Sequence, residues 1–452
     1  MSAAPNVAVV LLIGILYCGG RLLVDRLASL AYPWCDHPLM CYDYAEELAA
    51  SVDKSVDPCD NLYEHVCARW PRRYPAFNNS FAFLQVRTLT FLLHQLEHPG
   101  FEHESLAVRR IVTGYQACVL AFTEHREDIQ VAGYALARFF VDRAVQSRAV
   151  LDVTDAWNAV RNATRRNFPT LSWMDQSTAA GAINHVDNLV SIIALPAHLN
   201  SSQALDAFYD YLEADQSQLF FHWFIKSQKR RSDKLKRLIR EDPNVQVHRE
   251  DMPLSSYAVN AFYLPLYHIM SILPAIMAPP FVAPGLAPAV NYGAIGKILG
   301  HELSHAFDPR FSNQTRTGHF GTWWSQTSYD NFKQRLQCVR NQLANYTGSE
   351  SHGSNALSET FADTAGTEKA RLAYDSLPTQ PGMLGYSQEQ LFFVAGCFEF
   401  CAKDPYSWEA SEKYPAHALR CNLPVSNEKK FAAAFKCPTG AVLNPPKRCT
   451  FH

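Results

Sequence analysis

The sequence predicts a mainly α-helical protein with a few short strands. Long apolar stretches with helical spacing fill residues 81–150 and continue over 202–225. A proline-rich apolar stretch over 262–289 is too interrupted to form one helix. Cysteines crowd both ends of the chain, which indicates that disulfides join the two ends.

Composition narrows the class of protein. The chain has 452 residues, of which 48% are hydrophobic, so a disordered chain is excluded. Its length allows about three domains or two larger ones. The 41 Lys and Arg residues nearly balance the 43 Asp and Glu residues, which gives a net charge of −2. We therefore expect no nucleic-acid partner, because such a chain lacks a general phosphate-binding surface.

The first element is an uncharged apolar run of 14 residues over 7–20. It is short for a membrane span and typical of the hydrophobic core of a signal peptide. No Lys or Arg precedes it, so a signal-anchor fits equally well, and a buried core helix is a third interpretation. We expect the chain to lie on the extracellular face of the plasma membrane as a single-pass type II protein, with secretion as the alternative.

Two further features favour a compartment outside the cytosol. The chain has 12 cysteines and no C-x-x-C pair, so a zinc ribbon is not indicated. It also carries five N-x-S/T glycosylation sequons. Their asparagines are Asn78, Asn162, Asn200, Asn313 and Asn345.

The remaining elements follow in order. Residues 41–70 predict two helices around a Pro-Cys turn. Residues 226–240 contain eight basic residues, which we interpret as a solvated helix or linker in preference to a binding patch. A domain boundary is expected near 245–255, and residues 292–375 again have helical spacing.

The sharpest motif is His301-Glu302-Leu303-Ser304-His305. On a helix its two histidines lie one turn apart on one face, so both imidazoles can reach a single zinc ion. Glu302 projects beside such a metal and can take a proton from a water molecule. So short a pattern also arises by chance, and a second motif is needed to support it.

A catalytic zinc needs a third protein ligand and one open position. Glu359 and Asp363 are spaced to share a helical face. Glu359 can be the third ligand, and Asp363 can accept a hydrogen bond from the free ring nitrogen of a zinc histidine. Asp308 can do the same for the second histidine. Without the upstream motif, a solvated helix face would be the better interpretation of Glu359 and Asp363.

Together these motifs resemble the neprilysin and endothelin-converting-enzyme family of zinc metalloendopeptidases, of which the chain would be a shortened and divergent member. The segments correspond to the family's cysteine-rich start, substrate-backbone segment, zinc helix, second zinc motif and C-terminus. Thr360 stands where the second zinc motif usually has Asn. The matching segments are 33–70, 259–263, 291–308, 358–363 and 447–452.

The resemblance implies a two-lobed zinc metallopeptidase with a reduced helical roof lobe, because its helical stretch is far shorter than the family's. The implied parts are an N-terminal hydrophobic segment over 1–32 and a cysteine-rich arm over 33–70. A shortened helical domain over 71–250 and a catalytic domain over 253–452 complete the chain.

The implied function is zinc-dependent cleavage of extracellular peptides, with one Zn²⁺ per chain. Asn260 and Ala261 would bind the substrate backbone. The implied metal ligands are His301, His305 and Glu359. The implied catalytic residues are Glu302 as general base, Asp363, Arg420 and Tyr414.

Several positions depart from the family. Six residues before Arg420 the family has a histidine that stabilises the transition state, where this chain has Tyr414. A phenol donates a hydrogen bond but carries no positive charge. His417 is an alternative donor, although a surface histidine is its better interpretation. Lys297 replaces a usual apolar residue, and Glu399 falls in a region that lines the family's primed-side pocket.

The resemblance also implies disulfide pairs. Cys397 and Cys421 lie where the family has no cysteine. We expect a bridge between these two and a free thiol at Cys118; the alternative is a bond from Cys118 to one of them. The pairs implied by the resemblance are Cys35–Cys41, Cys59–Cys437, Cys67–Cys401 and Cys338–Cys449.

A rival hypothesis is a catalytically weakened or inactive ectodomain that binds peptides or a protein partner. The shortened roof and Tyr414 favour it, whereas the intact Glu302 opposes it. A purely structural membrane glycoprotein would leave the motifs unexplained. Membrane contact would run through the N-terminal segment if that segment is not cleaved, and the oligomeric state is left open.

Overall fold

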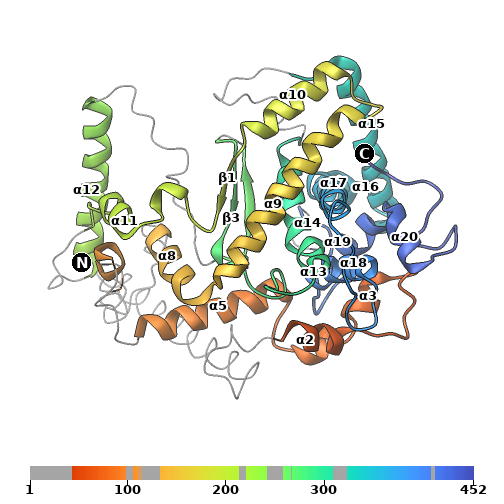
Figure 1. Cartoon of the computed structure of the whole chain (residues 1–452), viewed down its shortest axis with the longest axis horizontal. Helices are drawn as coiled ribbons and strands as arrows, with labels where there is room; N and C mark the ends of the chain where they lie inside the picture. The colour runs from red at the N-terminus through yellow and green to blue at the C-terminus, as the bar shows by residue number, and fades with distance from the viewer. Residues whose placement is uncertain are drawn as a thin grey trace, which may run out of the picture.

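The computed structural model describes residues 43–97, 105–110, 112, 133–212, 220–241, 258–265, 267–308, 323–408 and 413–451. Helices dominate this part of the chain, with one small sheet beside them (Figure 1). The predicted mainly α fold is confirmed.

The helices and strands run in the following order. In the first half they are α2 (Tyr44–Ser51), α3 (Leu62–Cys67), α4 (Trp70–Arg73), α5 (Ser80–Glu97), α8 (Gly133–Ala144), α9 (Ser147–Asn167), α10 (Gln176–Asp187), β1 (Val190–Ile193), α11 (Ser202–Phe208) and α12 (Phe220–Glu241). In the second half they are β2 (Ala261–Leu264), β3 (Ile269–Ile272), α13 (Pro288–Gly293), α14 (Ile295–His305), α15 (Gln326–Thr347), α16 (Glu350–Asn355), α17 (Leu357–Tyr374), α18 (Gln388–Phe398), α19 (His417–Ser426) and α20 (Lys429–Phe435).

Local capping chemistry explains where several helices begin. Asp175 accepts a hydrogen bond from the backbone of Thr178 at 2.8 Å and starts α10. Ser387 and Gln390 form a capping box at the start of α18. Gly348, with a φ of 65°, ends α15 in the left-handed conformation that glycine adopts without steric cost.

The sheet has the strand order β1–β3–β2. Strand β3 lies in the middle, parallel to β1 and antiparallel to β2. All four residues of β3 are buried, as expected for a central strand. Strands β2 and β3 and the turns after them occupy the proline-rich stretch, which is therefore not one helix. The free edge of β2 is left at one side of the sheet.

The core centres on α14. This helix packs against α17 and against the long helix α9, and the three lie together in the middle of Figure 1. Most residues of α17 are buried, including its charged ones, so α17 is an interior helix and not a solvated surface helix. The two helices α14 and α17 thus bring the two sequence motifs that they carry together in the interior of the protein.

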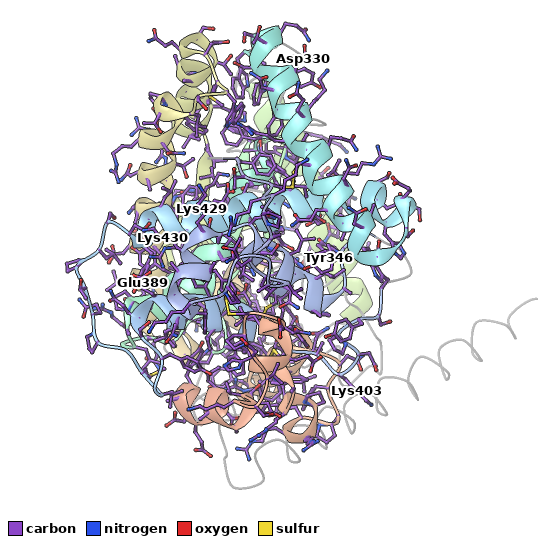
Figure 2. The ribbon with its side chains drawn as sticks, turned by 90° about the vertical axis from the view of Figure 1, so that its right-hand side faces the viewer. Asp330, Tyr346, Glu389, Lys403, Lys429 and Lys430 are labelled. Carbon is purple, nitrogen blue, oxygen red and sulfur yellow. A yellow bond between two sulfur atoms is a disulfide. The ribbon has the colours of Figure 1, made fainter. Side chains whose placement is uncertain are left out.

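The N-terminal arm packs against the end of the chain. Helices α2 and α3 lie beside the blue C-terminal segments in Figures 1 and 2. Two disulfides fasten this contact, Cys59–Cys437 with Cα atoms 5.3 Å apart and Cys67–Cys401 with Cα atoms 5.2 Å apart. Cys338–Cys449 and Cys397–Cys421 are the other two disulfides among the described residues. All four pairs coincide with those expected above.

Several expectations fall outside the described residues. These are the N-terminal segment over 1–32, the Cys35–Cys41 pair, Cys118, Asn313 and the boundary near 245–255. The asparagines of the other four sequons are all exposed, namely Asn78, Asn162, Asn200 and Asn345. The basic residues Lys226, Lys229 and Arg230 lie exposed on α12, as a solvated helix requires. None of the described helices is both long and apolar enough to cross a bilayer.

Candidate active site

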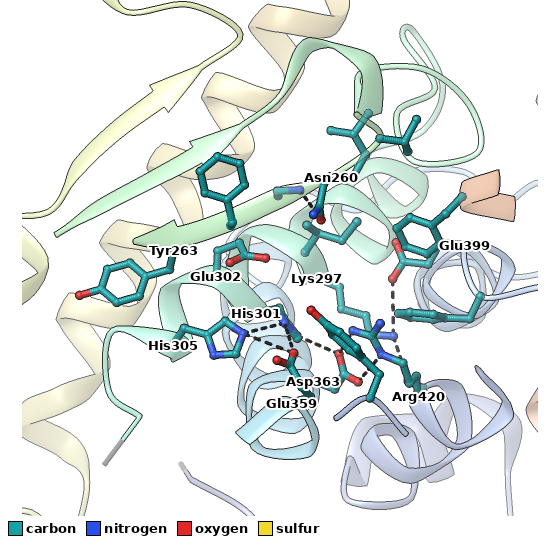
Figure 3. Close-up of a pocket in the computed structure, with 18 of the residues that line it drawn as sticks. Asn260, Tyr263, Lys297, His301, Glu302, His305, Glu359, Asp363, Glu399 and Arg420 are labelled. Carbon is teal, nitrogen blue, oxygen red and sulfur yellow. Dashed lines mark hydrogen bonds and ion pairs between the residues drawn. The ribbon is translucent and has the colours of Figure 1, made fainter. Parts of the chain in front are cut away.

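A cavity of about 650 Å³ lies between the two motif-bearing helices and the edge of the sheet. Helix α14 and helix α17 supply one side, β2 supplies another, and the segment around Tyr414 and Arg420 supplies a third (Figure 3). Residues from seven separate stretches of sequence therefore meet around one space.

The two histidines of α14 point toward one another. Their Nε2 atoms are 3.0 Å apart, as the one-turn spacing on a helix predicts. The other ring nitrogen of His301, Nδ1, lies 2.8 Å from Oδ1 of Asp363. Because a carboxylate only accepts, Nδ1 of His301 carries a proton. When the ring is neutral, as a metal ligand must be, the lone pair of its Nε2 then faces the space between the histidines.

Glu359 completes a triangle with the two histidines. Its Oε2 atom lies 3.3 Å from Nε2 of His301 and 3.5 Å from Nε2 of His305. These three residues are the one group of metal-ligand type found among the described residues. Oε2 of Glu359 is buried and has no hydrogen-bond partner within the described chain.

This triangle fits a zinc ion. Zinc–ligand bonds of about 2.0–2.1 Å in a tetrahedron put neighbouring ligand atoms about 3.3 Å apart. The three separations in the structure are 3.0, 3.3 and 3.5 Å. With both histidines neutral and bound through Nε2, three acceptor atoms would converge on one point, and they repel one another unless a cation lies among them.

The local charges favour a cation at the same place. Burial opposes the charged form of His301, but hydrogen bonds to Asp363 and Glu359 raise its pKa to about 10. The pKa of Glu359 is held well below its usual range; burial would raise it, but both histidines stabilise the carboxylate. The site therefore stabilises positive charge in its centre.

A close helix crossing brings the ligands together. Gly300 of α14 faces Gly366 of α17, and a Cβ atom at Gly300 would lie 2.3 Å from the carbonyl oxygen of Gly366. A Cβ at Gly366 would lie 2.5 Å from the backbone nitrogen of His301. Only glycine permits this approach, which sets the distance between the two histidines and Glu359.

Glu302 lies beside the triangle on the same helix. Its side chain is buried yet lines the cavity (Figure 3). Burial raises its pKa above the ordinary value, although the charges of His301 and His305 act in the opposite direction. A carboxyl group with a raised pKa can both accept and return a proton near neutral pH.

Asp363 connects His301 to Arg420. The guanidinium of Arg420 binds both oxygens of Asp363, with Nε–Oδ2 at 2.8 Å and Nη2–Oδ1 at 2.9 Å. Burial would raise the pKa of Asp363, but Arg420 and His301 hold it well below its usual range. This carboxylate therefore orients an imidazole on one side and a guanidinium on the other.

Both candidate donors named above line the cavity. The ring of Tyr414 stacks near Arg420, whose Cζ lies 5.2 Å from the ring centroid. Nζ of Lys413 lies 3.4 Å from the Tyr414 hydroxyl. His417 is not a surface histidine: it is mostly buried, and burial together with Arg420 lowers its pKa to about 4. It is therefore neutral near pH 7.

The edge strand meets the cavity at Asn260 and Ala261. The backbone nitrogen of Leu273 donates to the Asn260 carbonyl at 3.2 Å, so the next pair, Ala261 with Ile272, is a non-hydrogen-bonded pair. The backbone groups of Ala261 then point to the free edge of β2. Its N–H donates to Oδ1 of Asn260 at 2.9 Å, which leaves its carbonyl facing outward.

Asp308 is buried close to the second histidine. Its carboxylate accepts a hydrogen bond from the Ser358 hydroxyl, and its backbone nitrogen donates to the His305 carbonyl at 3.1 Å. The expected contact between Asp308 and the free ring nitrogen of His305 stays a prediction.

Residues 260–451 match the model of peptidase family M13. This part of the chain belongs to that family. An endothelin-converting enzyme homolog of Locusta migratoria is 29% identical to this chain and aligns with 82% of it. Neprilysin-1 of Trittame loki is 30% identical and aligns with 72% of the chain. Human endothelin-converting enzyme 1 is 29% identical over 70% of the chain.

Solved structures show the same fold. The zinc metalloprotease ZMP1 of Mycobacterium tuberculosis in its open state has a TM-score of 0.59 at 22% identity, over 75% of this chain and 55% of its own. A Haemonchus galactose-containing glycoprotein complex has a TM-score of 0.59 at 20% identity, over 84% of this chain and 61% of its own.

The chain spans about half the length of the curated relatives it matches. It covers 52% of the Locusta protein, 47% of the Trittame protein and 42% of the human one. The family match covers residues 260–451, which supply most of the residues that line the cavity.

Sequence reasoning missed three groups that support this cavity. Gly366 gave no signal, because its role depends on Gly300 lying opposite. Lys413 lies 3.4 Å from Oε1 of Glu359, across a sequence distance that no local pattern reveals. Nε2 of His185 lies 2.9 Å from the carbonyl oxygen of Ala306 at the end of α14, and Nε2 of His268 lies 2.8 Å from the backbone carbonyl oxygen of His185.

Proposed function

We propose that this chain is a zinc-dependent endopeptidase that cleaves extracellular peptides. The observation that carries the proposal is the triangle of His301, His305 and Glu359, whose separations match tetrahedral zinc, with Glu302 beside it. These three side chains would hold the metal. Zinc bound there would supply Lewis-acid polarisation of a carbonyl group and would lower the pKa of a water molecule.

Glu302 would act as the general base and then as the general acid. Its carboxylate accepts a proton from the attacking water and then gives that proton to the nitrogen of the leaving amine. Its burial supports this role, because desolvation raises its pKa toward the pH at which such transfer is efficient. The same helix holds Glu302 and the two proposed histidine ligands, so their relative positions are fixed.

Charge that develops on the scissile carbonyl would be stabilised by donors from the opposite side. Arg420 is held rigidly by its two bonds to Asp363, and Tyr414 offers a neutral hydroxyl. The neutral His417 is the alternative donor. Asp363 touches no substrate atom in this scheme: it positions His301 and Arg420.

The substrate would bind as an extended strand. The free edge of β2 offers the carbonyl of Ala261, and the amide of Asn260 lines the same cavity. An added strand gains backbone hydrogen bonds along such an edge without regard to sequence. Side-chain pockets next to the edge would then decide which peptides are cleaved.

The test is hydrolysis of a quenched fluorescent peptide library by the purified chain. We expect cleavage that stops when a zinc chelator is added and returns when zinc is restored. Glu302→Gln should retain zinc by metal analysis and lose about 10²–10⁴-fold in rate, because glutamine cannot accept the proton.

Retained cleavage by the Glu302→Gln protein would contradict the proposed base. Absence of cleavage by the zinc-loaded wild-type protein, together with tight peptide binding, would favour the inactive peptide-binding ectodomain.

A further inference from the structure

Glu399 is a buried carboxyl group in the wall of the cavity. It lies directly after α18, its side chain is 0% exposed, and it contributes to the cavity lining. Figure 3 shows it with Arg420 on the right of the cavity, whereas His305 lies on the left. Glu399 therefore belongs to the part of the cavity away from the second histidine.

Neither carboxyl oxygen of Glu399 has a hydrogen-bond partner in the described part of the chain. Buried polar groups are paired in the large majority of cases, and an unpaired one costs free energy. The nearest cation is Lys297, whose Nζ is 3.6 Å from Oε1, an ion-pair separation that is longer than a hydrogen bond.

Lys297 is already committed to other acceptors. Its Nζ donates to the carbonyl oxygens of Gly396 at 3.1 Å and Arg420 at 3.3 Å. It also lies 4.2 Å from the centroid of the Phe400 ring. Because these contacts hold the ammonium in place, Lys297 makes no hydrogen bond to Glu399 and leaves its carboxyl group available to a substrate side chain.

Resting on the proposed peptidase function, we propose that Glu399 and Lys297 form a polar side-chain subsite that selects an uncharged carboxamide or hydroxyl side chain of the substrate beside the scissile bond. A donor from such a side chain would supply the hydrogen bond that the Glu399 carboxyl lacks. An aliphatic side chain would bury that carboxyl more completely without pairing it.

Charge in the same wall argues against a basic side chain. Lys297 lies over the Phe400 ring, and Cζ of Arg420 lies 4.6 Å from the same ring centroid. A third cation between them would meet two like charges at short range in a poorly solvated space. A neutral donor avoids this repulsion.

The protonation of Glu399 agrees with a neutral partner. Burial raises its pKa to about 8, although Lys297 and Arg420 lower it. Near pH 7 the group is then largely a neutral carboxyl that both donates and accepts. A carboxamide offers the complementary acceptor and donor.

The experiment uses the full chain and a fluorogenic heptapeptide. Each of its central positions is changed in turn to Asn, Gln, Leu, Met or Lys, and cleavage sites are read by mass spectrometry. At one position next to the cleaved bond, we expect the Asn peptide to have a kcat/KM about tenfold to a hundredfold higher than the Leu peptide, and the Gln peptide to exceed the Met peptide to the same extent. The Lys peptide should be a poor substrate.

Variants assign the preference to Glu399. Glu399→Leu should reverse it toward Leu and Met, whereas Glu399→Gln, which keeps an acceptor and a donor, should retain it. Tyr44→Phe is the matched control: the Tyr44 hydroxyl is buried, unbonded within the described residues and electrostatically coupled to Glu399, but lies outside the cavity lining. This variant should leave the preference intact, and thermal melts establish that all variants are folded.

The outcomes separate the two proposals. A preference for Leu and Met in the wild type, or a polar preference that survives Glu399→Leu, would overturn the subsite while cleavage itself upholds the peptidase. If no peptide is cleaved, fluorescence anisotropy of the same peptides with Glu302→Gln protein decides: selective binding of the Asn peptide upholds the subsite, and unselective or absent binding overturns it.

Discussion

At the scale of single residues, the site combines groups whose ionisation is set by their neighbours. The carboxylates of Glu359 and Asp363 are kept charged by imidazole and guanidinium partners. For Glu302 and Glu399 burial outweighs the positive charges nearby, so the pKa of each is raised. Four acidic side chains in one cavity therefore divide into two that hold charge and two that can hold protons.

Tyr414→His should increase cleavage of small peptides. Arg420 lies 5.2 Å from the Tyr414 ring, so an imidazole there would face the same space as the phenol. A cationic donor stabilises a developing oxyanion better than a neutral one, by about 1–2 kcal/mol, or roughly 5- to 30-fold in rate. The measurement is kcat/KM on one peptide. An unchanged or lower rate would mean that Tyr414 is not the donor or that His417 already serves.

Glu399 should make stability depend on pH. Its pKa in the folded chain, about 8, lies above the ordinary 4.5, so between these values the folded protein holds a proton that the unfolded chain has released. Its contribution to the free energy of unfolding therefore falls as pH rises from about 4.5 to about 8.

The comparison that isolates this effect is Glu399→Gln, which cannot titrate. We expect the variant and the wild type to have similar stabilities at pH 5, and the variant to be more stable at pH 8 by on the order of 2–4 kcal/mol. Urea unfolding at both pH values measures it. Other buried acids titrate in both proteins and cancel; equal pH slopes would contradict the assignment.

At the scale of elements, the site depends on how closely α14 and α17 cross. The facing glycines, Gly300 and Gly366, let the helix backbones touch, so that side chains four residues apart on each helix converge. Lys369 of α17 adds a hydrogen bond of 2.9 Å to the Ser304 hydroxyl of α14 and locks the crossing from its buried side.

Gly366→Ala should disrupt this crossing. The added Cβ would lie 2.5 Å from the backbone nitrogen of His301, so one helix must shift, at a cost of about 1–3 kcal/mol. The separation of Glu359 from the histidines would change, and zinc should be lost more readily on dialysis.

Gly296→Ala is the matched control on α14, because its Cβ would meet its nearest neighbour at an ordinary 3.5 Å. Thermal melts and zinc content of the two variants make the comparison. Equal zinc retention in both would show that the crossing does not set the ligand triangle.

At the scale of the whole molecule, disulfides close the chain on itself. Cys59–Cys437 joins residues 378 apart in sequence, and Cys67–Cys401 joins residues 334 apart. Cys67–Cys401 fastens the N-terminal arm to the segment that carries Glu399, and Cys59–Cys437 fastens it to the segment that follows α20. Cys397–Cys421 joins α18 to α19 across only 24 residues, directly beside the carbonyls that bind Lys297.

Non-reducing peptide mapping should recover a linked Cys397–Cys421 peptide and an unpaired Cys118. The Cα atoms of Cys397 and Cys421 lie 4.9 Å apart, within the range that a disulfide spans. Replacing Cys59 and Cys437 together by serine should lower the free energy of unfolding by about 2–5 kcal/mol, because the closed loop is long. A peptide that links Cys118 to Cys397 or Cys421 would contradict the assignment.

The sequence by itself determined the helical class, the zinc-type motif and its partner acids, since each depends on spacing within one helix. A spacing of four residues puts His301 beside His305, and Glu359 beside Asp363, on one face of a helix, wherever the helices lie. It also identified the two cysteines without family counterparts, which the structure joins as expected.

Only the tertiary structure decided what depends on two distant segments meeting. Four features arise where separate helices pack. They are the burial of His417, the hydrogen bonds from Lys297 to two carbonyl oxygens, the close crossing at Gly300 and Gly366, and the carboxyl group of Glu399 without a hydrogen-bond partner in the described chain. No local pattern encodes such contacts, because each depends on the relative positions of several helices, and packing of the whole core sets those positions. The sequence therefore indicates which chemistry the cavity can perform. The packing of the helices around the cavity determines which groups contact a substrate side chain.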